Sequence, residues 1–244
     1  YDEPFADTSA FPTNMVASFT KETATVALTG DGGDEIFGGY KWYDFFSKSI
    51  NYNFSNFNKI RPLIHSLSRK SSTYINKFLK RLDLIFMNDL EKYAFYMGNM
   101  RDDYKYVYRK EFEINDDYDD LWYFRKFYKP ELPIFTRLQY LDFHTYLHDD
   151  ILTKVDRATM AVSLEARVPL LSRSIIEFSF SLPQEVRLYQ GSLKGLAKFS
   201  YLDTLPKEII NRDKKGFSIP TKVWGKNLYN DHIYPQETIL KQFL

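Results

Sequence analysis

The stretch TATVALTGDGGDEIFGGY, residues 23–40, decides how this sequence is interpreted. Residues 25–29 are short, apolar, rich in β-forming side chains and followed by glycine, which predicts a buried strand. Beyond the glycines, Ile36, Phe37 and Tyr40 have the spacing of one helix face. A strand, a glycine turn and a helix in this order are typical of an α/β unit with a parallel sheet.

The turn combines five of the ten glycines in the chain with three acids, Asp31, Asp34 and Glu35. Backbone N–H groups of such a turn bind phosphate or another anion, and ligands of parallel sheets bind at the carboxyl ends of strands. The acids would repel an anion unless a cation lies between them, and Mg²⁺ combines one or two carboxylates with substrate phosphates. The turn therefore predicts a Mg²⁺–nucleotide site. The alternative is that the acids only stabilise the N-terminus of the following helix.

The composition excludes several classes of protein. With 33 basic and 32 acidic side chains, the chain lacks the basic excess of a nucleic-acid binder. The absence of cysteine excludes disulfides, thiolate nucleophiles and cysteine metal sites in this chain. We see no apolar run long enough to span a membrane and no signal peptide. We therefore expect a cytoplasmic protein, and the sequence begins as if cut from a longer chain.

Most of the remaining sequence predicts helices. The patterns indicate a helix around residues 12–22, weak helical periodicity over 47–135, and one long helix with a single apolar face. They also indicate a helix after Ser172 and a short helix from Pro206. The apolar face comprises Leu147, Ile151, Val155, Ala158 and Val162. We thus predict an α/β part over 1–46 and a helical part over 47–244, with one or two parallel strands in total.

Two further groups of residues could carry chemistry. Asp150 and Lys154 share a helix stripe, where they form a surface ion pair or contact a ligand. Glu165 follows the apolar helix, where it acts as a base or orients a substrate, unless it only pairs with Arg167. Lys214 lies on a basic loop and could neutralise the charge that develops in nucleotidyl transfer, or could simply be solvated.

Taken together, these motifs resemble the C-terminal synthetase domain of the asparagine synthase (glutamine-hydrolysing) family. The matching stretches, in chain order, are DEPFADTSAFPT (2–13), LTGDGGDEIFGGY (28–40), DDILTKVDRATMAVSLEARVPLL (149–171), LP (182–183) and LPKEIINRDKKGFSIPTKVW (205–224). The resemblance implies an adenine-nucleotide α-hydrolase-like (ATP pyrophosphatase) fold. It also implies a carbon–nitrogen ligase that uses Mg²⁺ and ATP to convert aspartate to β-aspartyl-AMP, which ammonia then converts to asparagine.

The resemblance also assigns roles to residues of this chain. It implies ATP contacts, formation of the adenylate, a Mg²⁺ ligand and two further catalytic side chains. These roles fall on Thr29, Gly30 and Gly32 with Asp150 and Lys154 for ATP, Asp31 for the adenylate, Asp34 for Mg²⁺, and Glu165 and Lys214 for catalysis.

The sequence departs from the family pattern in several places. The pyrophosphate loop S-G-G-x-D-S and the glutaminase cysteine are absent. We therefore expect a fragment that needs the rest of its own chain and makes no asparagine alone. A threonine–arginine substrate segment is not visible near FADTSAFP. The acceptor therefore stays open between aspartate and another carboxylate, as do the nitrogen source and a homodimer.

Two other functions are weighed against an asparagine synthase. A relative such as β-lactam synthetase acts on another carboxylate, but it has tyrosine at the position of Asp31, which favours intermolecular amidation here. A non-catalytic helical binding module has no packing need for Asp31, Asp34, Glu165 and Lys214 together.

Overall fold

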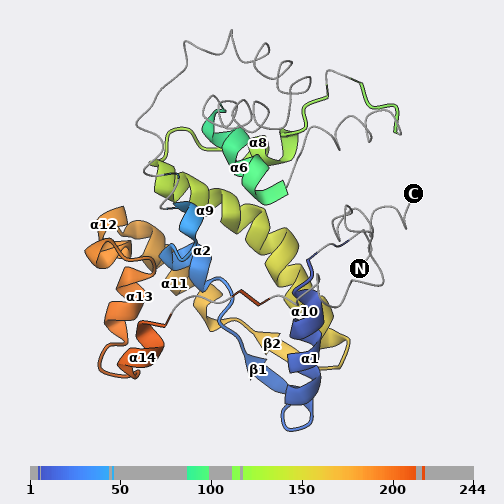
Figure 1. The fold of residues 1–244 in the computed structure, drawn as a ribbon, viewed down its shortest axis with the longest axis vertical. Coiled ribbons are helices and arrows are strands. Elements are labelled where there is room, and N and C mark those ends of the chain that lie inside the picture. Colours follow the sequence, from blue (N-terminus) through green and yellow to red (C-terminus); the bar gives the residue numbers. More distant parts are fainter. Residues whose placement is uncertain are drawn as a thin grey trace, which may run out of the picture. The chain divides into compact units, whose positions relative to one another are not determined.

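The computed structural model describes residues 5, 7–43, 46, 87–98, 112–115, 118–212 and 216–217. This part of the chain is mostly helical and contains a two-stranded parallel sheet, as the sequence predicts. Its elements are α1 (Ala10–Lys21), β1 (Val26–Leu28), α2 (Gly33–Phe37), α6 (Asp89–Gly98), α8 (Trp122–Phe127), α9 (Ile134–His144), the π-helix η2 (Tyr146–Leu152), α10 (Thr153–Met160), β2 (Glu165–Arg167), the 3₁₀ helix η3 (Pro169–Leu171), α11 (Arg173–Ser181), α12 (Gln184–Arg187), the 3₁₀ helix η4 (Tyr189–Gly191), α13 (Gly195–Ser200) and α14 (Lys207–Ile210) (Figure 1).

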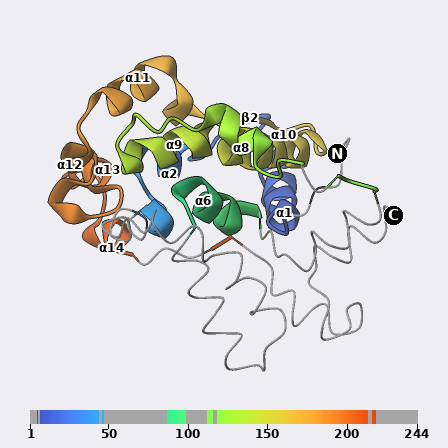
Figure 2. The same ribbon diagram turned by 90° about the horizontal axis from the view of Figure 1, so that it is seen from above.

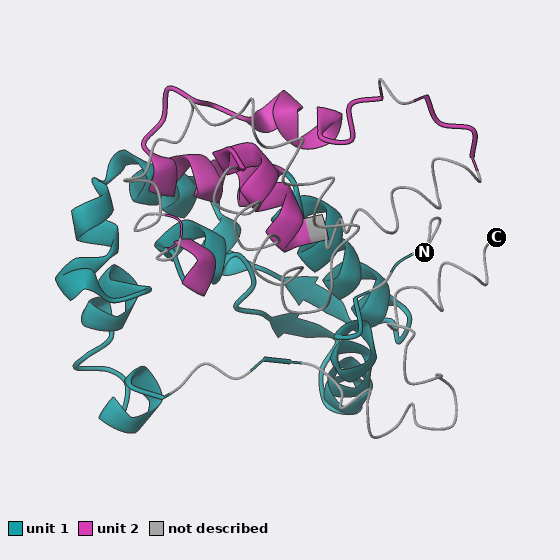
Figure 3. Cartoon of the chain, turned by 45° about the horizontal axis from the view of Figure 1, so that its top comes forward, with its two compact units in different colours: residues 1–39, 145–244 teal, residues 40–144 magenta. Residues whose placement is uncertain are grey.

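The chain divides into two compact units (Figure 3). Unit 1 combines residues 1–39 with 145–244, and unit 2 is residues 40–144. The glycine turn and both strands belong to unit 1. The predicted grouping of all 244 residues as one synthetase domain stays a prediction.

The sheet pairs two segments that lie far apart in the sequence. Strand β1 runs parallel to β2, with Val26 opposite Glu165 and Leu28 opposite Arg167. The predicted strand at 25–29 is thus confirmed. Strand β2 lies in the part predicted to be helical. Its residues, Glu, Ala and Arg, are depleted in strands or lack β-branching, so only the pairing with β1 reveals it.

The prediction that β1 is buried is wrong for its outward face. Val26 is 38% exposed and Leu28 is 74% exposed. Paired residues of neighbouring strands share a face, so these two side chains lie beside Glu165 and Arg167. An apolar pattern indicates a strand, but burial requires a second layer, and the described residues do not cover this face.

Helix α1 confirms the prediction for residues 12–22 and packs beside α10 (Figures 1 and 2). Asn14 donates a hydrogen bond from Nδ2 to the carbonyl of Ala158 over 3.0 Å. One turn along the same face, Ala17 is buried, and Lys21 donates from Nζ to the carbonyl of Ser163 over 2.7 Å. These residues are spaced as one helix face, so the contact fixes how α1 is rotated.

Two predicted helices are shorter than the sequence pattern suggests. Helix α2 ends at Phe37, because the left-handed backbone of Gly38 (φ 70°) stops the helix before Tyr40. The predicted long helix forms as the π-helix η2 followed directly by α10, and it ends at Met160, before Val162. The predicted apolar face is nevertheless confirmed from Leu147 to Ala158, because its four residues in this interval are buried.

The predicted starts of two later helices are confirmed. Ser172 precedes α11, although its side chain makes no capping hydrogen bond, and Pro206 precedes α14.

In unit 2, one buried carboxylate organises the aromatic core. Asp142 is fully buried and accepts hydrogen bonds from the hydroxyls of Tyr43 and Tyr93 and from the indole Nε1 of Trp42. Both tyrosines are themselves fully buried, and Tyr43 packs edge-on against Phe135. Three donors thus depend on one acceptor, because a buried donor without a partner is costly.

We expect Asp142→Ala to destabilise the chain by about 3 kcal/mol or more, since three buried or partly buried donors lose their acceptor. Urea unfolding followed by tyrosine and tryptophan fluorescence measures this change. Asp119→Ala is the matched control, because its carboxylate is 43% exposed and accepts hydrogen bonds from Arg125 and from the backbone N–H of Leu121. A midpoint for Asp142→Ala equal to that of the control would contradict the proposed dependence.

Candidate functional site

The glycine turn begins directly where β1 leaves the sheet. The backbone N–H of Thr29 donates to the carbonyl of Arg167 over 2.8 Å, which extends the ladder by one bond. The side-chain Oγ1 of Thr29 is buried, and no group in the described part of the chain hydrogen-bonds to it. A buried hydroxyl without a partner costs about 1–3 kcal/mol, so a hydrogen bond from a ligand at the turn would stabilise this group.

Three glycines of the turn pack closely against neighbouring side chains. Gly32 has φ +78°, and a Cβ there would lie 2.3 Å from Leu171 Cδ2. A Cβ on Gly33 would lie 3.0 Å from Leu170. A Cβ on Gly39 would lie 1.9 Å from Asp34 Oδ1.

Gly30 differs from these glycines. Among the described residues, no atom lies within 4 Å of the position that a Cβ would take, and its backbone has no positive φ. Neither packing nor conformation in this part of the chain requires glycine at position 30. Close approach of a ligand to the backbone would require it.

The three acids of the turn have different surroundings. Asp31 is half-buried, whereas Glu35 is 1% exposed and lies in the interior. Asp34 forms an ion pair with Lys194, with 3.1 Å between Oδ1 and Nζ. Asp34 and Glu35 lie in the first turn of α2, where the helix dipole favours a negative charge, but the N-cap is Gly32 and makes no side-chain cap.

Asp34 fits a metal ion only as a single ligand. The residues that the structure describes contain no group of three or more acidic, histidine or cysteine side chains that could hold a metal. Mg²⁺ bound with a nucleotide needs only one or two carboxylates, because phosphates and waters complete its coordination. The donor set is compatible with such a complex if Lys194 leaves the carboxylate.

The predicted catalytic residues are not joined by any contact that the structure shows. Glu165 accepts a hydrogen bond from Arg167 Nε over 2.7 Å, and both side chains are more than half exposed. Its strand partner Val26 is three residues before Thr29. The backbone of Glu165 is therefore about 10 Å along the strand from the turn. Lys214 lies outside the described residues.

Asp150 and Lys154 do not pair with each other as one interpretation of the sequence suggested. Lys154 Nζ instead donates to Asp7 Oδ2 over 2.8 Å, and the lysine side chain is 13% exposed. Ser9 also donates to Asp7 from its backbone N–H and its hydroxyl. Asp7 thus ties the segment before α1 to α10, a role that no short-range sequence pattern revealed.

The pKa values of the two carboxylates in this group, Asp7 and Asp150, are shifted in opposite directions. Burial alone would raise the pKa of Asp7, but the hydrogen bonds from Lys154 and Ser9 bring that pKa below its ordinary value. Burial, and then the charge of Asp7, raise the pKa of Asp150 to about 6. Oδ1 of Asp150 is buried and has no hydrogen-bond partner within the described ranges. The predicted contact of Asp150 and Lys154 with ATP stays a prediction.

Comparison with known proteins defines the family. The sequence model named asparagine synthase matches residues 1–237. The chain belongs to the asparagine synthase family. It is 30% identical over 239 residues to asparagine synthetase [glutamine-hydrolyzing] 1 of Bacillus subtilis (strain 168), covering 96% of this chain and 37% of that protein. It is 28% identical over 239 residues to the putative asparagine synthetase [glutamine-hydrolyzing] of Mycobacterium tuberculosis (strain ATCC 25618 / H37Rv), covering 91% of this chain and 34% of that protein.

Matches to other members of the asparagine synthase family are shorter. A putative asparagine synthetase [glutamine-hydrolyzing] 2 of Methanocaldococcus jannaschii is 34% identical over 166 residues, which cover 66% of this chain and 30% of that protein. The chain thus spans about a third of the length of the curated relatives that it matches. No solved structure matches it. None of the helices in the described part is both long enough and apolar enough to cross a membrane.

We expect Asp150→Asn to stabilise the chain above pH 7 by about 1–2 kcal/mol, a value reduced because the carboxyl is partly exposed. Between pH 4 and 6 the folded state keeps a proton that the unfolded state releases, so this favourable contribution is lost as the pH rises through about 6. Asparagine remains neutral and avoids that loss.

Urea unfolding of the wild type and of Asp150→Asn at pH 5 and pH 8 measures this effect. Asp149→Asn is the control, because Asp149 is the neighbour of Asp150 and its side chain is 42% exposed and bonds to His148. An equal stability difference at the two pH values would contradict the assignment.

Proposed function

We propose that the protein containing this chain is an ATP-dependent carbon–nitrogen ligase that converts aspartate and ammonia to asparagine. The aspartate β-carboxylate attacks the α-phosphorus of ATP, pyrophosphate leaves, and ammonia then displaces AMP from the β-aspartyl adenylate. One observation carries the nucleotide site. At the carboxyl end of β1, an unpartnered buried hydroxyl on Thr29 stands next to the sterically open backbone of Gly30. The family membership supports the reaction.

Each residue of the turn has a separate role in this proposal. The hydroxyl of Thr29 and the backbone of Gly30 bind the nucleotide. The backbone N–H of Gly32 donates to its phosphates. Asp31 assists formation of the adenylate. Asp34 provides one carboxylate for Mg²⁺, which neutralises phosphate charge when it is bound with the nucleotide.

The chemical steps need two further side chains. Lys214 stabilises the negative charge that develops on the phosphates during adenylation. Glu165 takes a proton from the attacking nitrogen, and its hydrogen bond from Arg167 orients the carboxylate. Asp150, on the π-helix η2, and Lys154, at the start of α10, support the nucleotide site.

The exposed face of the sheet supports the proposal that this chain works within a longer one. Parallel sheets in α/β proteins are covered on both faces, whereas Leu28 is 74% exposed here. The curated relatives are also about three times longer. We propose that the remaining chain completes an adenine-nucleotide α-hydrolase-like sheet and supplies the pyrophosphate loop and glutamine-derived ammonia. This chain alone is then inactive. We also propose that the protein works in the cytoplasm.

The proposed reaction predicts aspartate-dependent exchange of radiolabelled pyrophosphate into ATP by the full-length protein. Lys214→Ala should reduce this exchange at least a hundredfold, because one cation is lost from the transition state. The isolated chain, given Mg²⁺, ATP, aspartate and ammonium, should release no AMP. Exchange that needs a different carboxylate would replace aspartate as the acceptor, and exchange unchanged by Lys214→Ala would remove Lys214 from the mechanism.

Two glycine variants separate ligand binding from packing. Gly30→Ala should weaken ATP binding by the full-length protein about tenfold or more and leave its melting temperature unchanged, because none of the described residues would meet the new methyl group. Gly32→Ala is the control for packing. It should destabilise the protein by about 2 kcal/mol or more, since it combines a left-handed backbone with a clash against Leu171. Isothermal calorimetry and thermal melts measure both effects. Wild-type ATP affinity in Gly30→Ala would refute the contact.

A further inference from the structure

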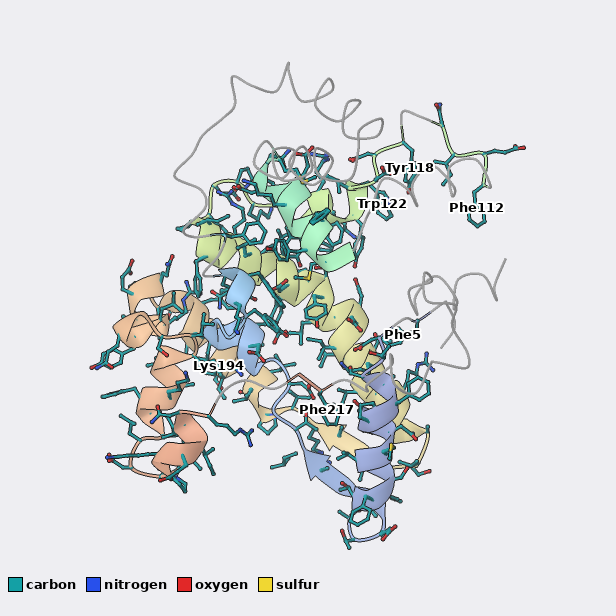
Figure 4. The ribbon with its side chains drawn as sticks, viewed as in Figure 1. Phe5, Phe112, Tyr118, Trp122, Lys194 and Phe217 are labelled. Atoms are coloured by element: carbon teal, nitrogen blue, oxygen red, sulfur yellow. The ribbon has the colours of Figure 1, made fainter. Side chains whose placement is uncertain are left out.

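The ion pair between Asp34 and Lys194 lies at the edge of the glycine turn. Asp34 belongs to the first turn of α2, and Lys194 immediately precedes α13, where its side chain faces α2 (Figure 4). Nζ of Lys194 is 3.1 Å from Oδ1 of Asp34, and the two side chains are 36% and 23% exposed. The pair is therefore only partly screened by solvent.

The surrounding backbone is shaped around this pair. Lys194 also donates its backbone N–H to the carbonyl of Gly38 over 3.3 Å, while Gly39 donates to the carbonyl of Asp34 over 2.7 Å. A Cβ on Gly39 would lie 1.9 Å from Asp34 Oδ1 and 2.3 Å from Lys194 Cε. The carboxylate and the lysine stem thus both lie against the bare backbone of one glycine.

Backbone conformation does not explain why residue 194 is a lysine. Lys194 has a left-handed backbone (φ +56°), which glycine adopts with less strain. The next residue, Gly195, is held so closely that a Cβ would lie 2.3 Å from the carbonyl oxygen of Tyr189. The backbone thus excludes a side chain at position 195, and at position 194 the lysine side chain contributes the contact with Asp34.

An ammonium group in this position competes with a divalent cation. Mg²⁺ binds a carboxylate oxygen at about 2.1 Å, so it cannot share Oδ1 with an ammonium 3.1 Å away without strong repulsion. We propose that Lys194 is the resident counter-ion of Asp34 and that binding of the Mg²⁺–nucleotide complex displaces it. Lys194 thereby sets the affinity of the site for divalent cations. This inference rests on the proposed function, in which Asp34 is a Mg²⁺ ligand.

The displacement gives the site two states. Without the metal, Lys194 neutralises Asp34 and keeps the first turn of α2 in place. With the metal, the Asp34 carboxylate would bind Mg²⁺ in place of the ammonium group, and Lys194 would move away from Oδ1. The cost of breaking the pair lowers the apparent metal affinity, so a variant without the positive charge binds a divalent cation more tightly.

The test is a titration of the full-length protein with Mn²⁺ as the probe, in the presence of a non-hydrolysable ATP analogue. Free Mn²⁺ is measured by electron paramagnetic resonance. Lys194→Gln should lower the half-saturating Mn²⁺ concentration about fivefold or more, as expected from loss of a partly exposed ion pair. Lys194→Arg, which keeps the charge, should stay within about twofold of the wild type.

The matched control is Lys198→Gln, one helical turn further along α13. Its Nζ bonds to Ser192 Oγ over 3.2 Å, so its removal should leave the Mn²⁺ titration unchanged. If Lys194→Gln does not fold, Lys194→Gly replaces it, because glycine accepts the left-handed backbone and also removes the charge. An unchanged or higher half-saturating Mn²⁺ concentration in a folded Lys194 variant would overturn the proposal.

Asp34→Asn separates this inference from the proposed function. Loss of Mn²⁺ binding in Asp34→Asn, together with tighter binding in Lys194→Gln, supports both. Loss of binding in Asp34→Asn with no change in Lys194→Gln overturns the role of Lys194 alone. Unchanged Mn²⁺ binding in Asp34→Asn removes Asp34 as a ligand and overturns this inference, while aspartate-dependent pyrophosphate exchange still tests the ligase activity.

Discussion

Parallel pairing of β1 with β2 is the contact on which unit 1 depends, because unit 1 is built from two segments separated by the whole of residues 40–144. Closing so long a loop costs chain entropy, which local interactions within each segment cannot offset. Two backbone hydrogen bonds extend the strand pair at its ends, from Glu165 to Thr25 and from Thr29 to Arg167. The packing of α1 on α10 is a further contact between the same two segments. These contacts together place the glycine turn beside the segment that follows β2.

Close approach of backbone to side chains then determines the shape of the turn. Gly32 and Gly33 lie against Leu171 and Leu170, which belong to the short helix just after β2. On the far side of α2, the buried hydroxyl of Ser179 donates to the carbonyl of Ile36 over 2.8 Å. The glycine-rich composition therefore has two physical causes. Most of these glycines permit packing, and Gly30 leaves backbone open to a ligand.

The carboxylates of the two units differ in what neutralises or satisfies them. Asp142 is buried among neutral aromatic donors, Asp7 is paired with a lysine that is 13% exposed, and Asp34 is paired with a more exposed lysine. A carboxylate that is satisfied by rigid buried donors stabilises one structure. A carboxylate that pairs with a partly exposed lysine can exchange that ammonium group for another cation. This difference in surroundings is why the three acids have different expected roles.

The sequence by itself determined the local elements and the family. Apolar spacing located α1, β1 and the buried face from Leu147 to Ala158, and the ordered motifs led to the asparagine synthase family, which the comparisons confirm. Periodicity could not detect the end of α2 before Gly38, because a left-handed glycine that stops a helix does not disturb the spacing of the apolar side chains around it.

Only the tertiary structure decided which distant groups meet. Strand β2 became recognisable through its pairing with β1, and the lysine partners of Asp7 and Asp34 come from segments far away in the chain. A lone lysine such as Lys194 carries no pattern that marks its partner. The sequence gives the charge of each side chain. Its burial and its neighbours, which determine the effect of that charge, arise only when separate segments pack together.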